Sequence, residues 1–203
     1  SGSENDFRLS PKFNAVYAAN ENTEYYFSEG YGFHSNDARG TTITIDPADR
    51  VTPIDRVDPI VGSKGAKLGA RFHWFDDLNT SIAVWGLRLD SELLYVGDAG
   101  NTEASDPSER YGIEVANHYA ASEWMSFDFD FAVTDTSLRI PGSEDEIPGA
   151  VDSVASAGVS FNPNNGWFGS LCFRHFGDRP LNEDGSVQSG SFSAFNARLG
   201  YKT

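Results

Sequence analysis

The most constraining feature of the sequence is how its connections alternate in length. About nine stretches of alternating apolar and polar residues follow one another, and the links between them are short, then long, in turn. The short links lie near residues 20–22, 76–79, 120–123 and 162–166, and the long ones cover roughly 34–62, 97–110, 139–149 and 178–190. Tight turns at one end of a sheet and long acidic loops at the other are typical of an outer-membrane β-barrel.

Composition agrees with one large β domain. The chain has 203 residues with 20 Gly, 9 Pro and 13% aromatic residues, which favours many strands over helices. No window approaches the roughly 18 consecutive apolar residues of a membrane helix, and a mean hydropathy of −0.41 suits barrel strands that hide their apolar face by alternation. A formal charge of −15 argues against nucleic acid as a partner. The lone Cys172 argues against a disulfide scaffold or a cysteine zinc site.

The alternation also predicts the two faces of the sheet. After Trp124, one face carries Met125, Phe127, Phe129, Phe131 and Val133, and the other carries Ser126, Asp128, Asp130, Ala132 and Thr134. Between 83 and 92, we expect Trp85, Leu87 and Leu89 to share the lipid-facing side with these phenylalanines, and Arg88 and Asp90 to point inward with Asp128 and Asp130. In a soluble β-sandwich the same apolar side chains would instead form the core, and that alternative stays open here.

Tryptophan placement favours the membrane. Trp74, Trp124 and Trp167 all lie within a few residues of the short turns, where an aromatic girdle at a membrane boundary is expected, because indole prefers the interface between polar and apolar solvent. The alternative is that aromatic residues simply favour strand ends. Tyr31, Phe33, Tyr95, Tyr111 and Phe176 lie near the long loops and are candidates for the opposite girdle.

Several stretches resemble a known family in the same order. They are Leu9-Ser10-Pro11-Lys12-Phe13, the run from Gly30 to Gly40, Lys64-Gly65-Ala66-Lys67-Leu68-Gly69-Ala70-Arg71, Tyr111-Gly112-Ile113-Glu114, Ile147-Pro148-Gly149-Ala150 and Asn196-Ala197-Arg198-Leu199-Gly200-Tyr201. Together they resemble the barrel of TonB-dependent outer-membrane receptors. The resemblance implies a ligand-gated importer of a small ligand such as an iron chelate, located in the bacterial outer membrane in contact with its lipid.

The strand pattern predicts an all-β antiparallel meander transmembrane β-barrel, or part of one, of about 9 to 10 strands, whereas the resemblance implies a complete barrel of 22 strands. We expect residues 1–6 to be a tag or a disordered start and 7–203 to be a single barrel domain or fragment. The sequence contains no recognisable plug, TonB box or terminal aromatic strand, so we expect contact with TonB only through a missing amino-terminal region. The alternatives are a small closed barrel with a passive pore or adhesive role, or a soluble β-sandwich binding module.

Sites are only weakly marked. No hydrolase elbow, phosphate loop or zinc helix is present, and His34, His73, His118 and His175 are scattered, so we expect no catalytic residues, no metal and no cofactor. Asp128 and Asp130 are interpreted as lumen-facing charges that are either solvated or paired with Arg88, Arg174 or Arg198 across the barrel. The acidic long loops fit a hydrated surface and lack a calcium-loop pattern. On position in the first long loop, the predicted ligand-proximal residues are His34, Asn36, Asp37 and Arg39.

Overall fold

The computed structural model of the chain describes residues 6–36, 41–42, 44–45, 50–53, 56–75, 77–91, 93–96, 101–104, 106–139 and 146–202. The nine strands of the main sheet are β1 (Lys12–Asn20), β2 (Thr23–Ser35), β3 (Ile60–Trp74), β4 (Leu78–Leu89), β7 (Ser108–Ser122), β8 (Met125–Leu138), β9 (Ser153–Phe161), β10 (Trp167–Phe176) and β13 (Phe192–Tyr201). Two small hairpins are β5 (Leu93–Val96) with β6 (Asn101–Ala104), and β11 (Arg179–Pro180) with β12 (Gln188–Ser189).

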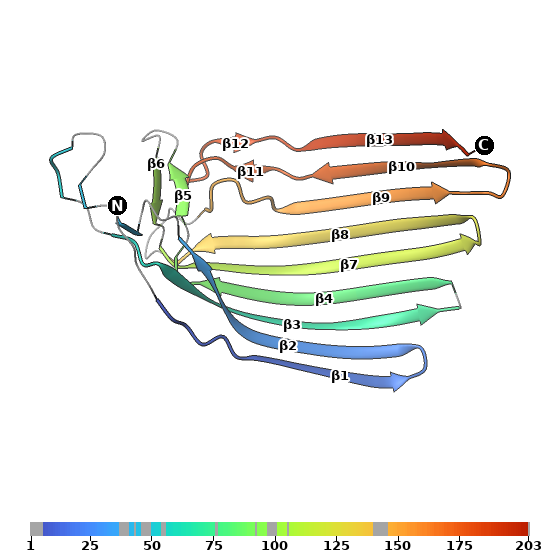
Figure 1. The fold of residues 1–203 in the computed structure, drawn as a ribbon, viewed down its shortest axis with the longest axis horizontal. Coiled ribbons are helices and arrows are strands. Elements are labelled where there is room, and N and C mark those ends of the chain that lie inside the picture. The colour runs from blue at the N-terminus through green and yellow to red at the C-terminus, as the bar shows by residue number, and fades with distance from the viewer. Residues whose placement is uncertain are drawn as a thin grey trace.

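The main sheet is an antiparallel meander. Its strand order is β1-β2-β3-β4-β7-β8-β9-β10-β13, so each main strand pairs with the next one along the chain. Short turns join the strands at one end, and the long connections, which carry both small hairpins, gather at the other end (Figure 1). The prediction of an antiparallel meander with sorted connections is therefore confirmed.

Local chemistry explains two of the short turns. Asn20 Oδ1 accepts a hydrogen bond from the backbone N–H of Asn22 at 2.9 Å, which closes the turn between β1 and β2. Between β9 and β10, Asn165 Oδ1 accepts from the N–H of Trp167 at 3.2 Å, and Gly166 has a φ of 88°. Glycine adopts that left-handed conformation without steric cost. These turn residues set the pairing register of the strands they join.

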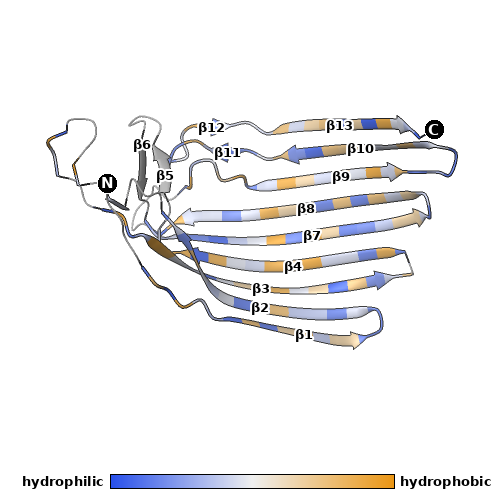
Figure 2. Ribbon diagram, in the orientation of Figure 1, coloured by the Kyte–Doolittle hydropathy of each residue, from blue (hydrophilic) through white to orange (hydrophobic). Residues whose placement is uncertain are grey.

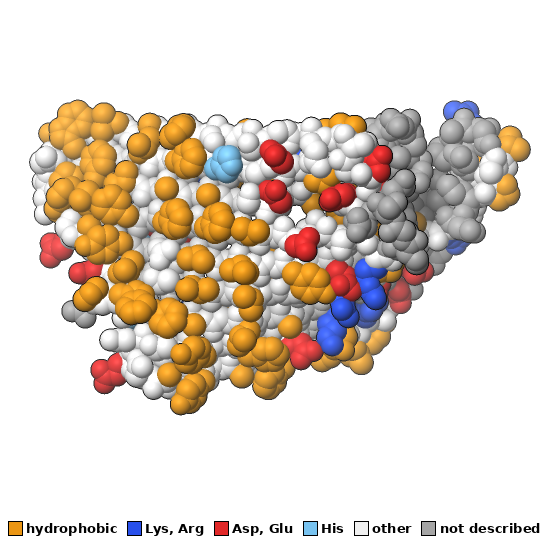
Figure 3. All heavy atoms as spheres, turned by 180° about the vertical axis from the view of Figure 1, so that it is seen from behind, with side chains coloured by type: hydrophobic (Ala, Val, Ile, Leu, Met, Phe, Trp, Pro, Cys, Tyr) orange, Lys and Arg blue, Asp and Glu red, His pale blue; other side chains and the backbone are white. Residues whose placement is uncertain are grey.

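Cross-strand register sorts the side chains into two faces. We call one the apolar face, and it runs across the strands in rows such as Leu68, Val84, Ile113 and Val133, each paired with its neighbour. Figure 2 shows the alternation along each strand, and Figure 3 shows rows of hydrophobic side chains covering one side of the sheet. The opposite side is the polar face. It includes Lys67, Arg71, Glu114, His118, Asp128, Asp130, Arg174 and Arg198.

Within the part of the chain that the structure describes, nothing packs over the apolar face. Among the described residues, the buried hydrophobic side chains are Val61, Ala83, Leu138 and Ile147 alone, whereas Phe129, Ile113 and Phe195 are exposed. A β-sandwich would bury one face against a second sheet, and the described strands form one large sheet with two small hairpins. The sandwich alternative is therefore wrong for the described part of the chain. Among the same residues, no helix is long and apolar enough to cross a membrane.

The prediction that Trp85, Leu87 and Leu89 lie on the apolar face is wrong. Trp85 pairs with Lys67 on β3 and with Gly112 on β7, which places it on the polar face. A Cβ atom built on Gly112 would lie 2.6 Å from the Trp85 indole, so this glycine leaves the space that the ring occupies. Phe127, Phe129 and Phe131 do lie on the apolar face, as predicted.

Near the long connections the polarity of the two faces is reversed. On the polar face, Val61 and Leu138 are buried and Ser108 is fully buried. On the apolar face at the same end, Arg88 pairs in register with Lys64 and Glu109, so the prediction that Arg88 points inward is wrong. This reversal is the physical reason for the error on β4, because a single strand then carries apolar residues on both of its faces.

Candidate functional site

Two ion pairs between β-strands organise the polar face. Lys67 Nζ lies 2.6 Å from Glu114 Oε2, joining β3 to β7 across β4. Arg71 Nη1 lies 2.5 Å from Glu24 Oε1, and its guanidinium carbon lies 4.7 Å from the centre of the Tyr26 ring. These side chains keep a third to a half of their surface exposed, so each pair contributes less than about 1 kcal/mol to stability. Their main effect is to present fixed charges of both signs.

Asp128 and Asp130 on β8 have side-chain partners on the neighbouring strands, and among the described residues these partners are His118 and Ser156 rather than an arginine. Asp128 Oδ1 lies 2.7 Å from His118 Nδ1, and Asp130 Oδ2 accepts from Ser156 Oγ at 3.0 Å. Beside them, His73 Nδ1 contacts Asn79 Oδ1. Among the residues that the structure describes, no group of three or more His, Cys, Asp or Glu side chains could hold a metal ion. The arrangement is a hydrogen-bonded polar wall.

An open pocket of about 480 Å³ lies on the polar face beside this wall. Trp85 and Leu87 supply its apolar surface, and Lys67 with Glu114 supplies a charged pair. The Trp85 Nε1 atom is buried and has no hydrogen-bond partner among the residues that the structure describes. An aromatic wall next to fixed charges is suited to a small ligand with both apolar and polar parts. The other lining residues are Lys12, Asn14, Ser28, Glu29, Gly30, Gly65, Ala66 and Gly86.

Of the predicted ligand-proximal residues, two can be placed. His34 pairs in register with Val61, at the long-connection end of the polar face, and is half-buried. Asn36 Nδ2 donates to the Asp58 carbonyl at 2.8 Å, and its backbone N–H donates to the Pro59 carbonyl at 3.0 Å. Asn36 therefore fastens the two ends of the first long connection together. Asp37 and Arg39 lie outside the described residues.

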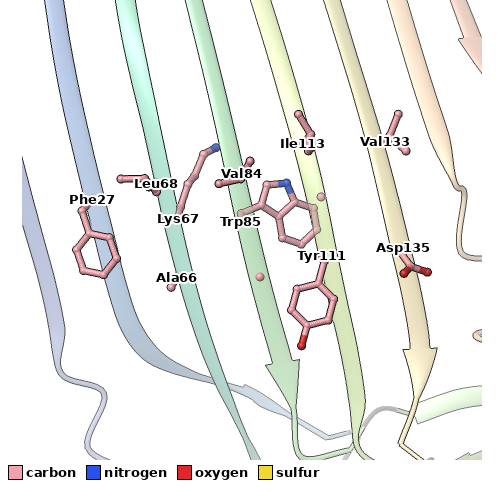
Figure 4. Close-up of a pocket in the computed structure, with 12 residues that line it drawn as sticks. Phe27, Ala66, Lys67, Leu68, Val84, Trp85, Tyr111, Ile113, Val133 and Asp135 are labelled. Carbon is pink, nitrogen blue, oxygen red and sulfur yellow. The ribbon is translucent and has the colours of Figure 1, made fainter.

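The apolar face has a groove of its own, of about 620 Å³. Phe27, Leu68, Val84, Ile113 and Val133 line it from successive strands, with the small Ala66 forming part of its floor (Figure 4). Tyr111 and Asp135 stand at one end of the groove in the same view. A sheet face this apolar and this exposed marks a surface that is covered in the working protein.

All three predicted girdle tryptophans lie at the short-turn end of the sheet. Trp74 is the last residue of β3, Trp124 occupies the turn between β7 and β8, and Trp167 is the first residue of β10. Each is close to half exposed. Trp74 stacks on Phe72 with ring centres 5.4 Å apart, and Trp167 packs against Tyr201 at 5.1 Å.

Reasoning from the sequence missed the Trp85 pocket. A usable signal was present, because Lys67 and Gly112 each alternate with apolar residues on their own strand, and both pair in register with Trp85. The pairing of Asp128 with His118 was equally accessible, since the two residues flank the turn at Glu123 and Trp124. Both signals can be used only when the pairing register between strands is known, and no single segment of the sequence specifies that register.

Comparison with known proteins finds one matching family model and solved structures of similar fold. Residues 1–203 match the model described as TonB-dependent receptor-like β-barrel. The fold is similar to that of the ferric yersiniabactin uptake receptor FyuA of Yersinia pestis, with 14% identity, a TM-score of 0.67 and 94% of this chain covered. It is also similar to the copper transporter OprC, with 16% identity, a TM-score of 0.70 and 95% coverage.

A third similar structure is the ferric preacinetobactin receptor BauA of Acinetobacter baumannii, with 14% identity, a TM-score of 0.68 and 96% of this chain covered. The chain spans only 29% of FyuA, 31% of OprC and 30% of BauA. At these identities the likeness establishes the fold, and the nine-stranded sheet corresponds to part of a larger barrel. A search of curated proteins finds no significant sequence match.

Proposed function

Because the chain belongs to the TonB-dependent receptor β-barrel family, we propose that it forms part of the wall of an outer-membrane receptor that imports a small ligand such as an iron chelate. The short turns face the periplasm, and the long connections face the outside of the cell. Energy for uptake comes from TonB, which acts on a part of the receptor outside this segment. The segment contributes barrel wall and ligand-proximal loops without catalysing a reaction.

The observation that carries this proposal is the contrast between the two faces. Exposed rings such as Phe129 and Phe195 cover one face, and ion pairs such as Lys67–Glu114 cover the other. Lipid outside and water inside are the two solvents that such a sheet requires. The girdle role of Trp74, Trp124 and Trp167 belongs to the same proposal, because an exposed indole at the ends of such strands is stabilised at the membrane boundary.

The ligand is proposed to pass along the polar face. Trp85 and the Lys67–Glu114 pair line an open pocket there, and His34 lies at the end where the ligand would enter. Asp37 and Arg39 remain proposed contacts in the first long connection. The receptors and transporters named above carry ferric chelates or copper, which makes a metal chelate the first class of ligand to test.

Uptake in cells tests the proposal. A strain lacking the gene, with and without the full-length gene restored, is given a panel of radiolabelled iron chelates. We expect accumulation of at least one chelate only in the restored strain, and we expect a protonophore or deletion of TonB to abolish it. Uptake that persists without TonB would instead favour the passive barrel. Recovery of the full-length protein in the soluble fraction would contradict the membrane assignment.

The loop assignment needs its own variants. We expect His34→Ala combined with Asp37→Ala to weaken chelate binding by purified full-length receptor at least tenfold, because both side chains are proposed to contact the ligand. The matched control is His175→Ala, which changes a histidine on the apolar face near the same end of the sheet. Unchanged binding by the double variant would refute the loop assignment.

A further inference from the structure

Basic side chains cluster at the long-connection end of the apolar face. Arg88 Nε lies 3.0 Å and Arg139 Nε 2.8 Å from the same atom, Glu109 Oε1. Lys64 Nζ lies 3.3 Å from Glu29 Oε1 and 5.4 Å from the centre of the Tyr31 ring. We call Arg8, Lys64, Arg88 and Arg139 the basic cluster, and all four line one depression of about 280 Å³.

The charge of this cluster runs against that of the chain. The chain carries 30 acidic and only 15 basic residues, yet four of the basic ones meet here. Glu29, Asp90 and Glu109 are the acidic partners of these four side chains, and Asp135 adds a further carboxylate at the adjoining end of the groove. Figure 3 shows the blue side chains gathered beside the orange rows, toward the long connections.

The basic side chains are accessible to a further anion. Between 37% and 59% of each side chain's surface is exposed. The ion pairs of Arg88 and Arg139 with Glu109 use Nε, so these two ion pairs do not engage the terminal nitrogens. Arg88 makes a further side-chain hydrogen bond with Tyr111. Glu109 also accepts a hydrogen bond from the Tyr111 hydroxyl at 2.6 Å, which fixes the carboxylate that holds both arginines side by side.

The groove on the apolar face adjoins the basic cluster. Ala66 and Gly86 line the groove two residues along their strands from Lys64 and Arg88, on the same face. Residues two apart on one face of a strand are separated by about 7 Å. One ligand can therefore place an anionic group on the cluster and an apolar chain between Phe27 and Val84.

We propose that this surface binds an anionic membrane lipid, with its phosphate on the basic cluster and an acyl chain in the apolar groove. Guanidinium groups present paired donors that match phosphate oxygens, and lysine adds a point charge. Basic pockets beside a membrane-spanning surface bind lipid headgroups for this reason. The site rests on the proposed membrane location of the apolar face, but not on uptake or on the identity of the imported ligand.

The test uses purified full-length receptor in a neutral detergent and native mass spectrometry to count bound lipids. The probes are phosphatidic acid, the matched diacylglycerol without phosphate, and inorganic phosphate. We expect one phosphatidic acid to bind with an affinity at least tenfold above that of diacylglycerol. Arg88→Gln with Arg139→Gln should reduce that binding at least tenfold, and Ala66→Phe should reduce it by filling the groove.

The matched control is Arg174→Gln with Arg198→Gln, which removes two positive charges from the polar face. It should leave lipid binding unchanged. Equal binding of phosphatidic acid and diacylglycerol, or no loss in the double arginine variant, would overturn the headgroup site. A further contrary outcome is that inorganic phosphate displaces bound phosphatidic acid as strongly as the lipid itself does, with no effect of Ala66→Phe on binding. That result would show a site for free anions and would overturn the proposal of a lipid site. The Ala66→Phe variant retains both arginines, so a folding defect in the double variant does not decide the result.

The outcome for the proposed function is separate. A full-length receptor that binds the lipid but supports no chelate uptake would contradict the proposed function and leave the lipid site standing.

Discussion

A charge placed on the apolar face tests the membrane assignment most directly. Phe129 lies near the middle of β8 on that face and is 48% exposed in this chain. For a phenylalanine area of roughly 200 Å², that fraction is about 100 Å², and covering it with lipid stabilises the fold by about 2.5 kcal/mol at 25 cal/mol per Å². Phe129→Arg loses that term and adds a penalty of about 2–4 kcal/mol for arginine at the bilayer midplane.

The expected cost of Phe129→Arg is therefore about 4.5–6.5 kcal/mol. Ala116→Arg is the matched control, because Ala116 is exposed on the polar face and pairs in register with Asp130, at nearly the same depth. An arginine there gains a carboxylate neighbour, so we expect a change of less than about 1 kcal/mol.

The assay is reversible unfolding of the full-length receptor in phospholipid vesicles by guanidinium chloride, with the free energy of unfolding extrapolated to zero denaturant. Equal losses for the two variants, or a larger loss for Ala116→Arg, would refute the reasoning. A larger loss for Ala116→Arg would mean that the polar face, rather than the apolar one, contacts lipid.

Two further predictions follow from the geometry. On β4, Val84→Arg should destabilise the receptor in vesicles by about 2–4 kcal/mol more than Trp85→Arg does, and the reverse order in the same unfolding assay would contradict the register. In the connection between β10 and β13, the hydrogen bonds that Asp184 accepts, first from the backbone N–H and then from the hydroxyl of Ser186, lower the pKa of Asp184. These contacts are fully present above the ordinary carboxyl pKa and are lost as pH falls through the lowered value. Amide exchange at Ser186, corrected for intrinsic rates, should therefore accelerate in acid in the parent, whereas Asp184→Asn should show no such step.

The strands and turns could be predicted because their signals are local. Alternation over residues 125–133 identifies β8 and its apolar face, and the asparagine and glycine turn at 162–166 separates β9 from β10. Each of these signals lies within a few residues of the element that it specifies. Local signals of this kind are almost enough to predict a meander, because every main strand pairs with its sequence neighbour.

The faces of β4 could not be read from that strand alone. Ile82 and Val84 are apolar on one side, and Ala83 and Trp85 are apolar on the other. Only the neighbours decide the assignment, because Trp85 fits where Gly112 has no side chain. Contacts across a long connection were equally inaccessible: Asn36 reaches the carbonyl of a residue 22 positions away, and nothing in the sequence between them indicates that pairing.

The reversal of polarity near the long connections also locates one boundary of the apolar face. On β3, β4 and β7 the change occurs between Ala66 and Lys64, between Gly86 and Arg88, and between Tyr111 and Glu109, and these residues pair in register. The boundary is therefore one line across three strands. On β8, the residues from Trp124 at the short turn to Asp135, opposite Tyr111, span about 36 Å of strand at 3.3 Å per residue. Tilted by about 40°, that length covers about 28 Å of height, close to the apolar band of about 25 Å that such barrels present to lipid. In the proposed membrane orientation, the basic cluster lies at the outer edge of this band, at the depth expected for the phosphate groups of a membrane lipid.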